Sequence, residues 1–270
     1  MRPRFPRLSI GCPRRVDSSA HRRNTAPRVL SLDKSHPLFQ VEMSTAGRFS
    51  IAFIMASGDG PPLIRQLVDP TEEEIDQIID ALTRAFEDNV GMQSMCGGDK
   101  ALESLVYRLT LQQAIQHGDC YVARNGDTIC GVAAWLAPGF DWTIQRDNQF
   151  ASKLSSDLEE WYRDHFTPKY DELYRSGFPG DPHMRQQSWS LKLLAVSPHC
   201  RRKGVGKALL DVISKKADTR RESIVVDVMD PYLVNFFQAC GFKYRAVKNV
   251  SSTSFPGFPI WCMVRKSAGS

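Results

Sequence analysis

The segment SWSLKLLAVSPHCRRKGVGKALL, residues 188–210, constrains the fold of this chain more than any other. Its first half is apolar and typical of a buried strand, and its second half begins a helix directly after two glycines. Three cations, Arg201, Arg202 and Lys203, lie in the turn between them. Glycines and a helix N-terminus present free backbone N–H groups and a positive dipole end at one point. The segment therefore predicts an anion-binding turn that joins a strand to a helix.

Strands and helices alternate along the rest of the chain from residue 62 onward. Gly/Pro breaks and an Asn125-Gly126-Asp127 turn separate stretches with strand or helix periodicity. We expect, in order, strand 63–68, helix 71–86, helix 100–117, a hairpin over 120–139, helices within 140–187, strand 188–198, helix 203–217, strand 223–229, helix 231–240 and strand 259–266. This alternation predicts one mixed α/β domain over residues 61–270, with helices flanking a central sheet.

Residues 1–60 differ from this body in composition. They hold ten basic residues and four acidic ones, which gives this segment a net charge of +6. The whole chain has a net charge of +5, so the remaining residues together are close to neutral. We expect a basic, disordered leader, although its Arg/Ser bias also fits a mitochondrial transit segment. A nearly neutral body gives no reason to expect nucleic-acid binding, and no apolar run is long enough to predict a membrane span. We expect a cytoplasmic protein, with a mitochondrial location open.

The seven cysteines, at positions 12, 96, 120, 130, 200, 240 and 262, are scattered. They form no CxxC pair and no Cys/His cluster with metal-ligand spacing. We therefore expect reduced thiols and no metal site.

The turn sequence Arg201-Arg202-Lys203-Gly204-Val205-Gly206 does not match a P-loop or a GxGxxG motif. It resembles the Q/R-x-x-G-x-G/A motif of the GNAT superfamily of acyl-CoA-dependent N-acyltransferases. Within that superfamily the sequence most resembles puromycin N-acetyltransferase-like members. The resemblance lies in the segment Val132 to Trp135 and in the C-terminal segment Trp261 to Lys266. The resemblance spans roughly residues 62–266 and is thinnest over 140–187. It implies a mixed, mostly antiparallel sheet with a splayed strand pair, flanked by helices.

The resemblance also implies a site for acetyl-CoA as co-substrate. The main chain of the strand from Leu193 would bind the pantetheine arm, and the amides of the turn would bind the pyrophosphate. The implied cofactor-binding residues are Leu194, Ala195, Val196, Arg201, Arg202, Lys203, Gly204, Val205, Gly206 and Lys207, with Asn235 and Phe237 on the later helix.

Acetyl transfer to an amine needs a deprotonated amine, a stabilised oxyanion and a protonated leaving thiolate. Asp227 matches an acid that puromycin-acetylating relatives carry on this strand, so it is the candidate base or amine ligand. The family places a tyrosine acid four residues before the Gly of Gly241-Phe242, but this chain has Phe237 there. Tyr232 could replace it, water could protonate the thiolate, or the thiolate could leave unassisted.

The acceptor pocket is expected in the pieces that diverge from the family. The substrate candidates are Phe86, Glu87, Asp88, Trp135 and Trp142, with Trp161, Tyr162 and Tyr170 from the aromatic segment. The resemblance implies a monomeric or homodimeric N-acetyltransferase that acts on a small-molecule primary amine. A protein lysine or N-terminal acetyltransferase, or a catalytically weak acyl-CoA-binding protein suggested by Phe237, are the alternatives.

Overall fold

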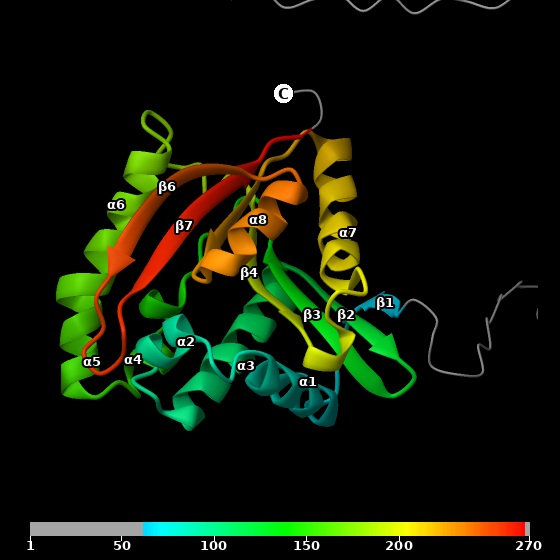
Figure 1. Ribbon diagram of the computed structural model, residues 1–270, viewed down its shortest axis with the longest axis horizontal. Helices are drawn as coiled ribbons and strands as arrows, with labels where there is room; N and C mark the ends of the chain where they lie inside the picture. The colour runs from blue at the N-terminus through cyan, green and yellow to red at the C-terminus, as the bar shows by residue number, and fades with distance from the viewer. Residues whose placement is uncertain (1–61, 268–270) are drawn as a thin grey trace, which may run out of the picture. The chain divides into compact units, whose positions relative to one another are not determined.

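The computed structural model describes residues 62–267, so the predicted leader lies outside the described residues. One seven-stranded sheet runs through the described part, with helices on both of its faces (Figure 1). The strands are β1 (Leu63–Gln66), β2 (Gly118–Asn125), β3 (Thr128–Leu136), β4 (Trp189–Val196), β5 (Ile224–Val228), β6 (Lys243–Val250) and β7 (Phe258–Arg265). The α-helices are α1 (Glu72–Ala85), α2 (Val90–Met95), α3 (Lys100–His117), α4 (Asn148–Ala151), α5 (Ser156–Trp161), α6 (Thr167–Gly177), α7 (Val205–Arg220) and α8 (Pro231–Ala239).

The strand order is β1-β2-β3-β4-β5-β7-β6. Every neighbouring pair is antiparallel except β4 and β5, which are parallel. The helix α7 makes the crossover between these two strands, as a parallel connection requires. The prediction of a mixed, mostly antiparallel sheet flanked by helices is confirmed.

The parallel pair separates along its length. β4 and β5 are in register only through Trp189–Leu191 and Ile224–Val226. From Lys192 to Val196, β4 continues beside β3 alone, and β5 ends at Val228. The predicted splayed strand pair is therefore present, and it opens the sheet towards the carboxyl ends of β4 and β5.

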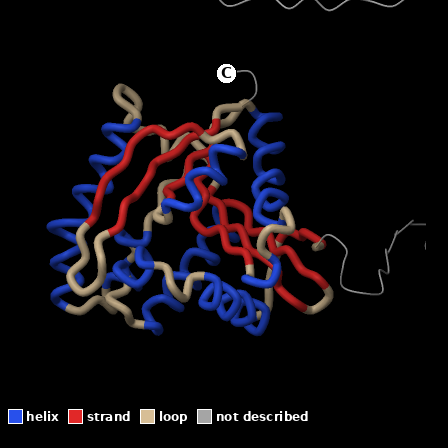
Figure 2. Tube along the Cα trace, in the orientation of Figure 1, coloured by secondary structure: helices blue, strands red, loops and turns tan. Residues whose placement is uncertain are grey.

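Two hydrophobic cores lie on the two faces of this sheet. One core packs β2, β3 and β4 against α7, and α8 joins it through Phe237. The other packs the opposite face against α1, α3 and the aromatic helices α5 and α6. The helices accordingly flank the strands in Figure 2, and α6 runs along β6 and β7.

Local sequence accounts for most helix boundaries. Thr71 accepts a hydrogen bond from the Glu74 N–H and begins α1, and three acids fill the first turn. Asp99 caps α3 in the same way. Because these caps are readable, the predicted helices and strands match the structure closely, including α3 at both ends.

The prediction missed two elements. β6 is an edge strand whose sequence, KYRAVKNV, is mostly exposed and has no regular apolar alternation. The six-residue helix α2 is too short to show periodicity. No helix in residues 62–267 is long and apolar enough to cross a bilayer.

Gly131 allows α7 to pack closely on the sheet. A Cβ added there would lie 2.9 Å from the Ala195 carbonyl oxygen and 3.0 Å from a methyl of Leu209. Since the contacted oxygen belongs to a strand, Gly131→Ala is expected to lower the free energy of unfolding by about 1–3 kcal/mol. Urea denaturation measures this change, and Thr128→Val at the exposed start of the same strand is the control. Equal stability of both variants would contradict the close packing.

Candidate active site

A cleft of about 740 Å³ occupies the opening between the splayed strands. Its size is that of a site for a cofactor or a small ligand, and its lining is mostly apolar. β4 contributes every residue from Leu191 to Val196, and β5 contributes Val226 to Val228. The rest of the lining includes Ala85, Phe86, Met92, Met95, Val106, Thr110, Trp142, Gln145, Phe166, Tyr170, Arg201, Arg202, Gly204, Val205, Gly206, Lys207, Tyr232, Leu233, Phe236 and Phe237.

One end of the cleft is the N-terminus of α7. The first backbone bond of this helix runs from the Ala208 N–H to the Gly204 carbonyl. Within residues 62–267, the N–H groups of Val205, Gly206 and Lys207 have no hydrogen-bond partner. Three free N–H groups at the positive end of a 16-residue helix suit a phosphate group.

The conformation of the turn depends on its glycine. Gly204 has φ +81°, which is the left-handed region, and a Cβ added there would meet nothing within 4 Å. Arg202 adopts φ +63° two residues earlier. Glycine therefore relieves strain at Gly204 and leaves the approach to the helix N-terminus open.

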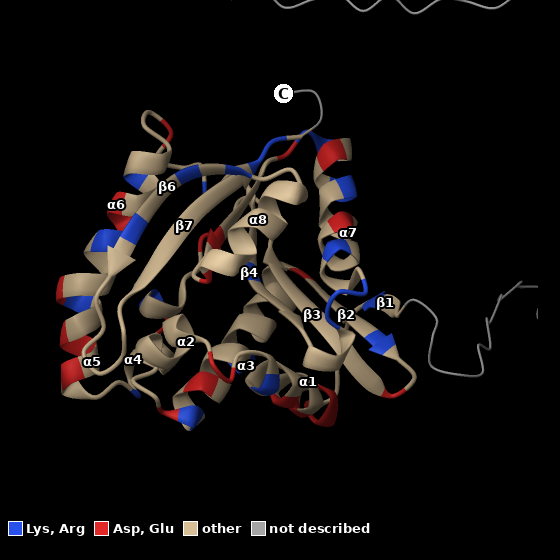
Figure 3. Ribbon diagram, in the orientation of Figure 1, with Lys and Arg blue, Asp and Glu red and all other residues tan. Residues whose placement is uncertain are grey.

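The cations of this turn differ in their partners. The Arg201 guanidinium donates to the carbonyls of Val196 and Ala85, at 3.2 Å each, and so ties the turn to β4 and α1. Lys207 pairs with Asp211 at 2.6 Å. Arg202 and Lys203 are exposed and make no ion pair or side-chain hydrogen bond with other described residues. Figure 3 shows this basic turn as a blue segment at the start of α7.

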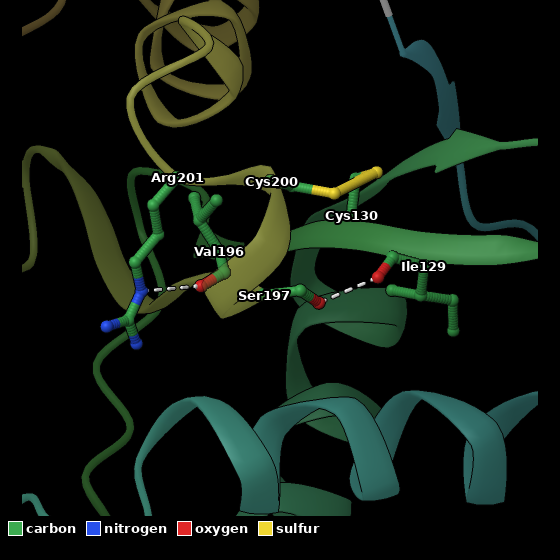
Figure 4. Close-up of a disulfide and its surroundings, with 6 residues drawn as sticks. All are labelled: Ile129, Cys130, Val196, Ser197, Cys200 and Arg201. Carbon is green, nitrogen blue, oxygen red and sulfur yellow. Dashed lines mark hydrogen bonds between the residues drawn. A yellow bond between two sulfur atoms is a disulfide. The ribbon is translucent and has the colours of Figure 1, made fainter. Parts of the chain in front are cut away.

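A disulfide lies directly before the turn. Cys130 on β3 and Cys200 are joined, with Cα atoms 5.5 Å apart and a sequence separation of 70 (Figure 4). The Ser197 hydroxyl donates to the Ile129 carbonyl beside it, at 2.7 Å. For this pair the expectation of reduced thiols is wrong, because cysteines distant in sequence become neighbours only through the antiparallel pairing of β3 and β4. The other four cysteines in the described part of the chain are free.

Asp227 lies on β5 inside the cleft, as an isolated acid among valines. Its Oδ2 accepts a hydrogen bond from the Tyr170 hydroxyl at 2.5 Å, and its Oδ1 accepts one from the Tyr174 hydroxyl at 2.9 Å. Burial, and then the negative charge of Asp227, raises the pKa of both tyrosines well above the usual value, so both remain donors. α6 therefore fixes the orientation of the predicted catalytic carboxylate.

Two basic residues near Asp227 were missed by sequence reasoning. The Arg185 guanidinium lies over the rings of Tyr170 and Tyr174, 5.3 and 5.0 Å from their centres, and forms an ion pair with Asp141. Lys192 is in the cleft lining, at the point where β4 leaves β5. A readable signal existed only for Lys192, which is the single charged residue in the strand sequence WSLKLLAV.

The cleft contains some of the predicted substrate and acid residues and excludes others. Phe86 and Trp142 line it, and the Trp142 indole donates to Asp147. Trp135 is fully buried in the core on the α7 side of the sheet, because it follows the alternation of β3 to that face. Glu87 and Asp88 are exposed and lie outside the lining.

The acid candidates lie on α8. Tyr232 lines the mouth of the cleft and is 89% exposed, whereas Phe237 is buried against the α7-side core. Asn235 is exposed and, like Lys203, lies outside the lining. Of the other aromatic candidates, Tyr170 lines the cleft, and Trp161 and Tyr162 pack in the core beside it.

No group of three or more His, Cys, Asp or Glu side chains that could hold a metal ion occurs within residues 62–267. The polar groups of the cleft are instead backbone amides, hydroxyls, the carboxylates of Asp227 and Asp230, and several cations. Such groups suit a polyanionic co-substrate at one end and proton transfer at the other.

Comparisons with known proteins agree with this geometry. Residues 180–259 match the family model of the acetyltransferase (GNAT) domain. No curated protein matches the chain. Among solved structures, arylalkylamine N-acetyltransferase 2 from Aedes aegypti has a TM-score of 0.52 at 16% identity, and the match covers 75% of this chain and 98% of that one.

Two further structures have the same architecture. "Histone acetyltransferase HPA2 and related acetyltransferase" from Corynebacterium glutamicum has a TM-score of 0.53 at 22% identity, with 78% of this chain and 99% of that one covered. An agmatine N-acetyltransferase has a TM-score of 0.55 at 13% identity, with 76% and 98% covered. Residues 180–259 thus match the GNAT acetyltransferase domain, and the described residues share the fold of these three solved acetyltransferase structures.

Proposed function

We propose that this protein transfers the acetyl group of acetyl-CoA directly to the amino group of a small-molecule primary amine. The observation that carries the proposal is the cleft, which joins a helix N-terminus suited to a phosphate group to an end lined by aromatic and ionisable side chains.

The co-substrate half rests on two features that the cleft connects. The free N–H groups of Val205 to Lys207 and the cations Arg202 and Lys203 suit a pyrophosphate. From Lys192 to Val196, β4 has no strand partner on the β5 side, so its main chain is available to an extended arm. These two features are continuous through the cleft, as one long co-substrate requires.

The acceptor half rests on how the far end is covered. The segment between β3 and β4 contributes Trp142, Gln145, Phe166 and Tyr170 to the lining. Most of this segment packs into the core with α5 and α6, and Tyr170 places it directly beside the Asp227 carboxylate. A carboxylate among aromatic rings suits the ammonium group of a small amine.

Two relatives in fold are named for small amines, an arylalkylamine and agmatine. The narrower resemblance to puromycin N-acetyltransferases stays a prediction. A protein substrate is the second candidate, since one similar structure carries the name of a histone acetyltransferase. The covered acceptor end favours a small molecule, because a peptide needs an open groove.

Because of Phe237, a catalytically weak acyl-CoA-binding protein is the alternative outside the class of active enzymes. Phenylalanine cannot donate a proton, and Tyr232 lies at the cleft mouth. A thiolate is a good leaving group near neutral pH, however, so it can depart without the general acid that cleavage of an amide requires. The cytoplasmic location and the oligomeric state remain predictions, and a persistent Cys130–Cys200 disulfide would be unusual in a reducing compartment.

The test is product formation by the full chain. Acetyl-CoA is incubated with arylalkylamines, a guanidino-alkylamine, puromycin and a lysine-containing peptide, and acetylated products are identified by mass spectrometry. We expect acetylation of at least one small amine at a rate well above the peptide. Peptide acetylation alone would favour the second candidate, and binding of acetyl-CoA without any product would favour the weak binder.

A further inference from the structure

Lys192 occupies an irregular position in β4. The pairing of β3 with β4 shifts between Ala134 and Trp135, so that Lys192 is the extra residue of a β-bulge. Leu191 before it packs in the α7-side core, and Leu193 after it packs in the opposite core. The bulge thus reorients the strand at this residue, which bulges beside functional sites often do.

Lys192 and Asp227 lie across the opening from each other. Asp227 shares its sheet face with Val225, whose side chain packs in the core on the α6 side, and the tyrosines bonded to Asp227 come from α6. Both Lys192 and Asp227 line the same cleft. They flank the place where the parallel strands separate.

The charged groups around Lys192 already have other partners. Asp227 accepts from Tyr170 and Tyr174, and Arg185 pairs with Asp141. These titratable groups face Lys192 from β5 (Asp227), from α6 (Tyr170 and Tyr174), from the loop after β3 (Asp141) and from the loop after α6 (Arg185). Among the described residues, Lys192 forms no ion pair and no side-chain hydrogen bond. Among the charged groups described at this end of the cleft, the ammonium group of Lys192 is therefore the one without a close partner.

Burial governs the ionisation of Lys192. Removal from water lowers its pKa from 10.5 to about 8, Asp227 opposes this shift, and Arg185 adds to it. A lysine with a pKa near 8 is partly neutral at physiological pH, whereas an ordinary surface lysine is not. Lysines tuned in this way by burial act as proton acceptors in enzymes.

We propose that Lys192 is the catalytic base that takes the proton from the acceptor nitrogen. This assignment rests on the proposed function. The bound ammonium group first loses one proton to water. The free amine then attacks the thioester carbonyl carbon, and a C–N bond forms while the carbonyl oxygen becomes an oxyanion. Neutral Lys192 takes a proton from the resulting N–H group. The C–S bond then breaks with its electron pair on sulfur, the thiolate gains a proton, and Lys192 returns its proton to water.

Asp227 has a different role in this scheme. Its two oxygens already accept hydrogen bonds, and its charge stabilises a cation beside it, either the protonated Lys192 or the incoming ammonium group. Lys192, whose pKa is about 8, is matched to a nitrogen that loses its proton during bond formation. Asp227 therefore holds the amine, and Lys192 moves the proton.

A competing role for Lys192 is to bind an anionic group of the acceptor. Two substitutions separate the roles. Lys192→Arg keeps the positive charge but cannot lose its proton, and Lys192→Met keeps the length of the side chain without charge or base. A base role predicts that both variants lower kcat/KM about 100-fold or more. An anion-binding role predicts that only the Met variant does so.

The experiment measures kcat/KM against pH for the full chain with two amines of different pKa. In the wild type we expect kcat/KM to rise with pH and to level off above about pH 8, with the same midpoint for both amines. Neither Lys192 variant should show this rise. Lys215→Met, on the exposed face of α7, is the matched control and should behave as the wild type. Calorimetry with acetyl-CoA checks that the Lys192 variants still fold and bind the co-substrate.

The outcomes are distinguishable. A wild type that acetylates amines together with an active Lys192→Arg variant overturns the base assignment alone. If the midpoint of the rise in kcat/KM differs between the two amines and follows their pKa values, the rise reports ionisation of the amine. This result would also overturn the base assignment. A folded wild type that acetylates no amine overturns the proposed function, and the assignment falls with it.

Discussion

Gly204→Glu is expected to weaken acetyl-CoA binding about 100-fold or more. Position 204 is open, so the new carboxylate would lie beside the free N–H groups of Val205 to Lys207 and repel the pyrophosphate. Placing like charges together at a binding site costs several kcal/mol, and about 2.7 kcal/mol corresponds to 100-fold. Isothermal titration calorimetry with acetyl-CoA measures the change.

The left-handed conformation of Gly204 requires a control, because any side chain there adds strain. Asparagine tolerates this conformation and is a good helix cap, so Gly204→Asn should cost less than tenfold in affinity. Thermal unfolding shows whether both variants fold. Equal affinities for the glutamate and asparagine variants would mean that the turn does not bind the phosphates.

Asp227→Asn is expected to lower kcat/KM for a cationic amine by about 10- to 100-fold. Hydrogen bonds to charged groups contribute about 1.5–3 kcal/mol, and asparagine removes the charge while it preserves the shape of the side chain. The same change should move the rising limb of the pH profile to lower pH. The direction follows because Asp227 raises the pKa of Lys192, and loss of this charge lowers that pKa further.

Steady-state kinetics between pH 6 and 9 tests both effects. Asp76→Asn, an exposed acid of α1 paired with Arg108, removes an equal charge far from the cleft and should change neither quantity. Tyr170→Phe removes one donor to the carboxylate and should give a smaller loss. An Asp227→Asn variant with wild-type kcat/KM and an unmoved limb would exclude Asp227 from amine binding and from contact with the base.

The fold and the strand-turn-helix geometry before α7 were predictable because their signals are local. Caps, turns and periodicity define each element, and the Arg201 to Gly206 turn needs only its own backbone and the helix behind it. Asp227 was also readable, as an acid inside an apolar strand.

The acceptor end was less predictable, because it depends on which strands become neighbours. Trp135 was expected in the pocket, but the strand alternation turns it to the α7-side core. The contacts of Tyr170 and Tyr174 with Asp227, and the Cys130–Cys200 disulfide, join residues more than 50 positions apart. Single-sequence patterns report local periodicity and do not report such pairings.

Lys192 lies between these cases. A lysine in WSLKLLAV is as visible as an aspartate in IVVDV, but its importance comes from a bulge and a splayed neighbour that only the three-dimensional structure shows.

Isothermal titration calorimetry of the wild-type full chain with acetyl-CoA, and then with CoA, tests the central claim most directly. The cleft and the free N–H groups of α7 predict one site per chain with micromolar affinity for both ligands, since both carry the same pyrophosphate. A folded protein that shows no binding up to millimolar acetyl-CoA would contradict the assignment of this cleft.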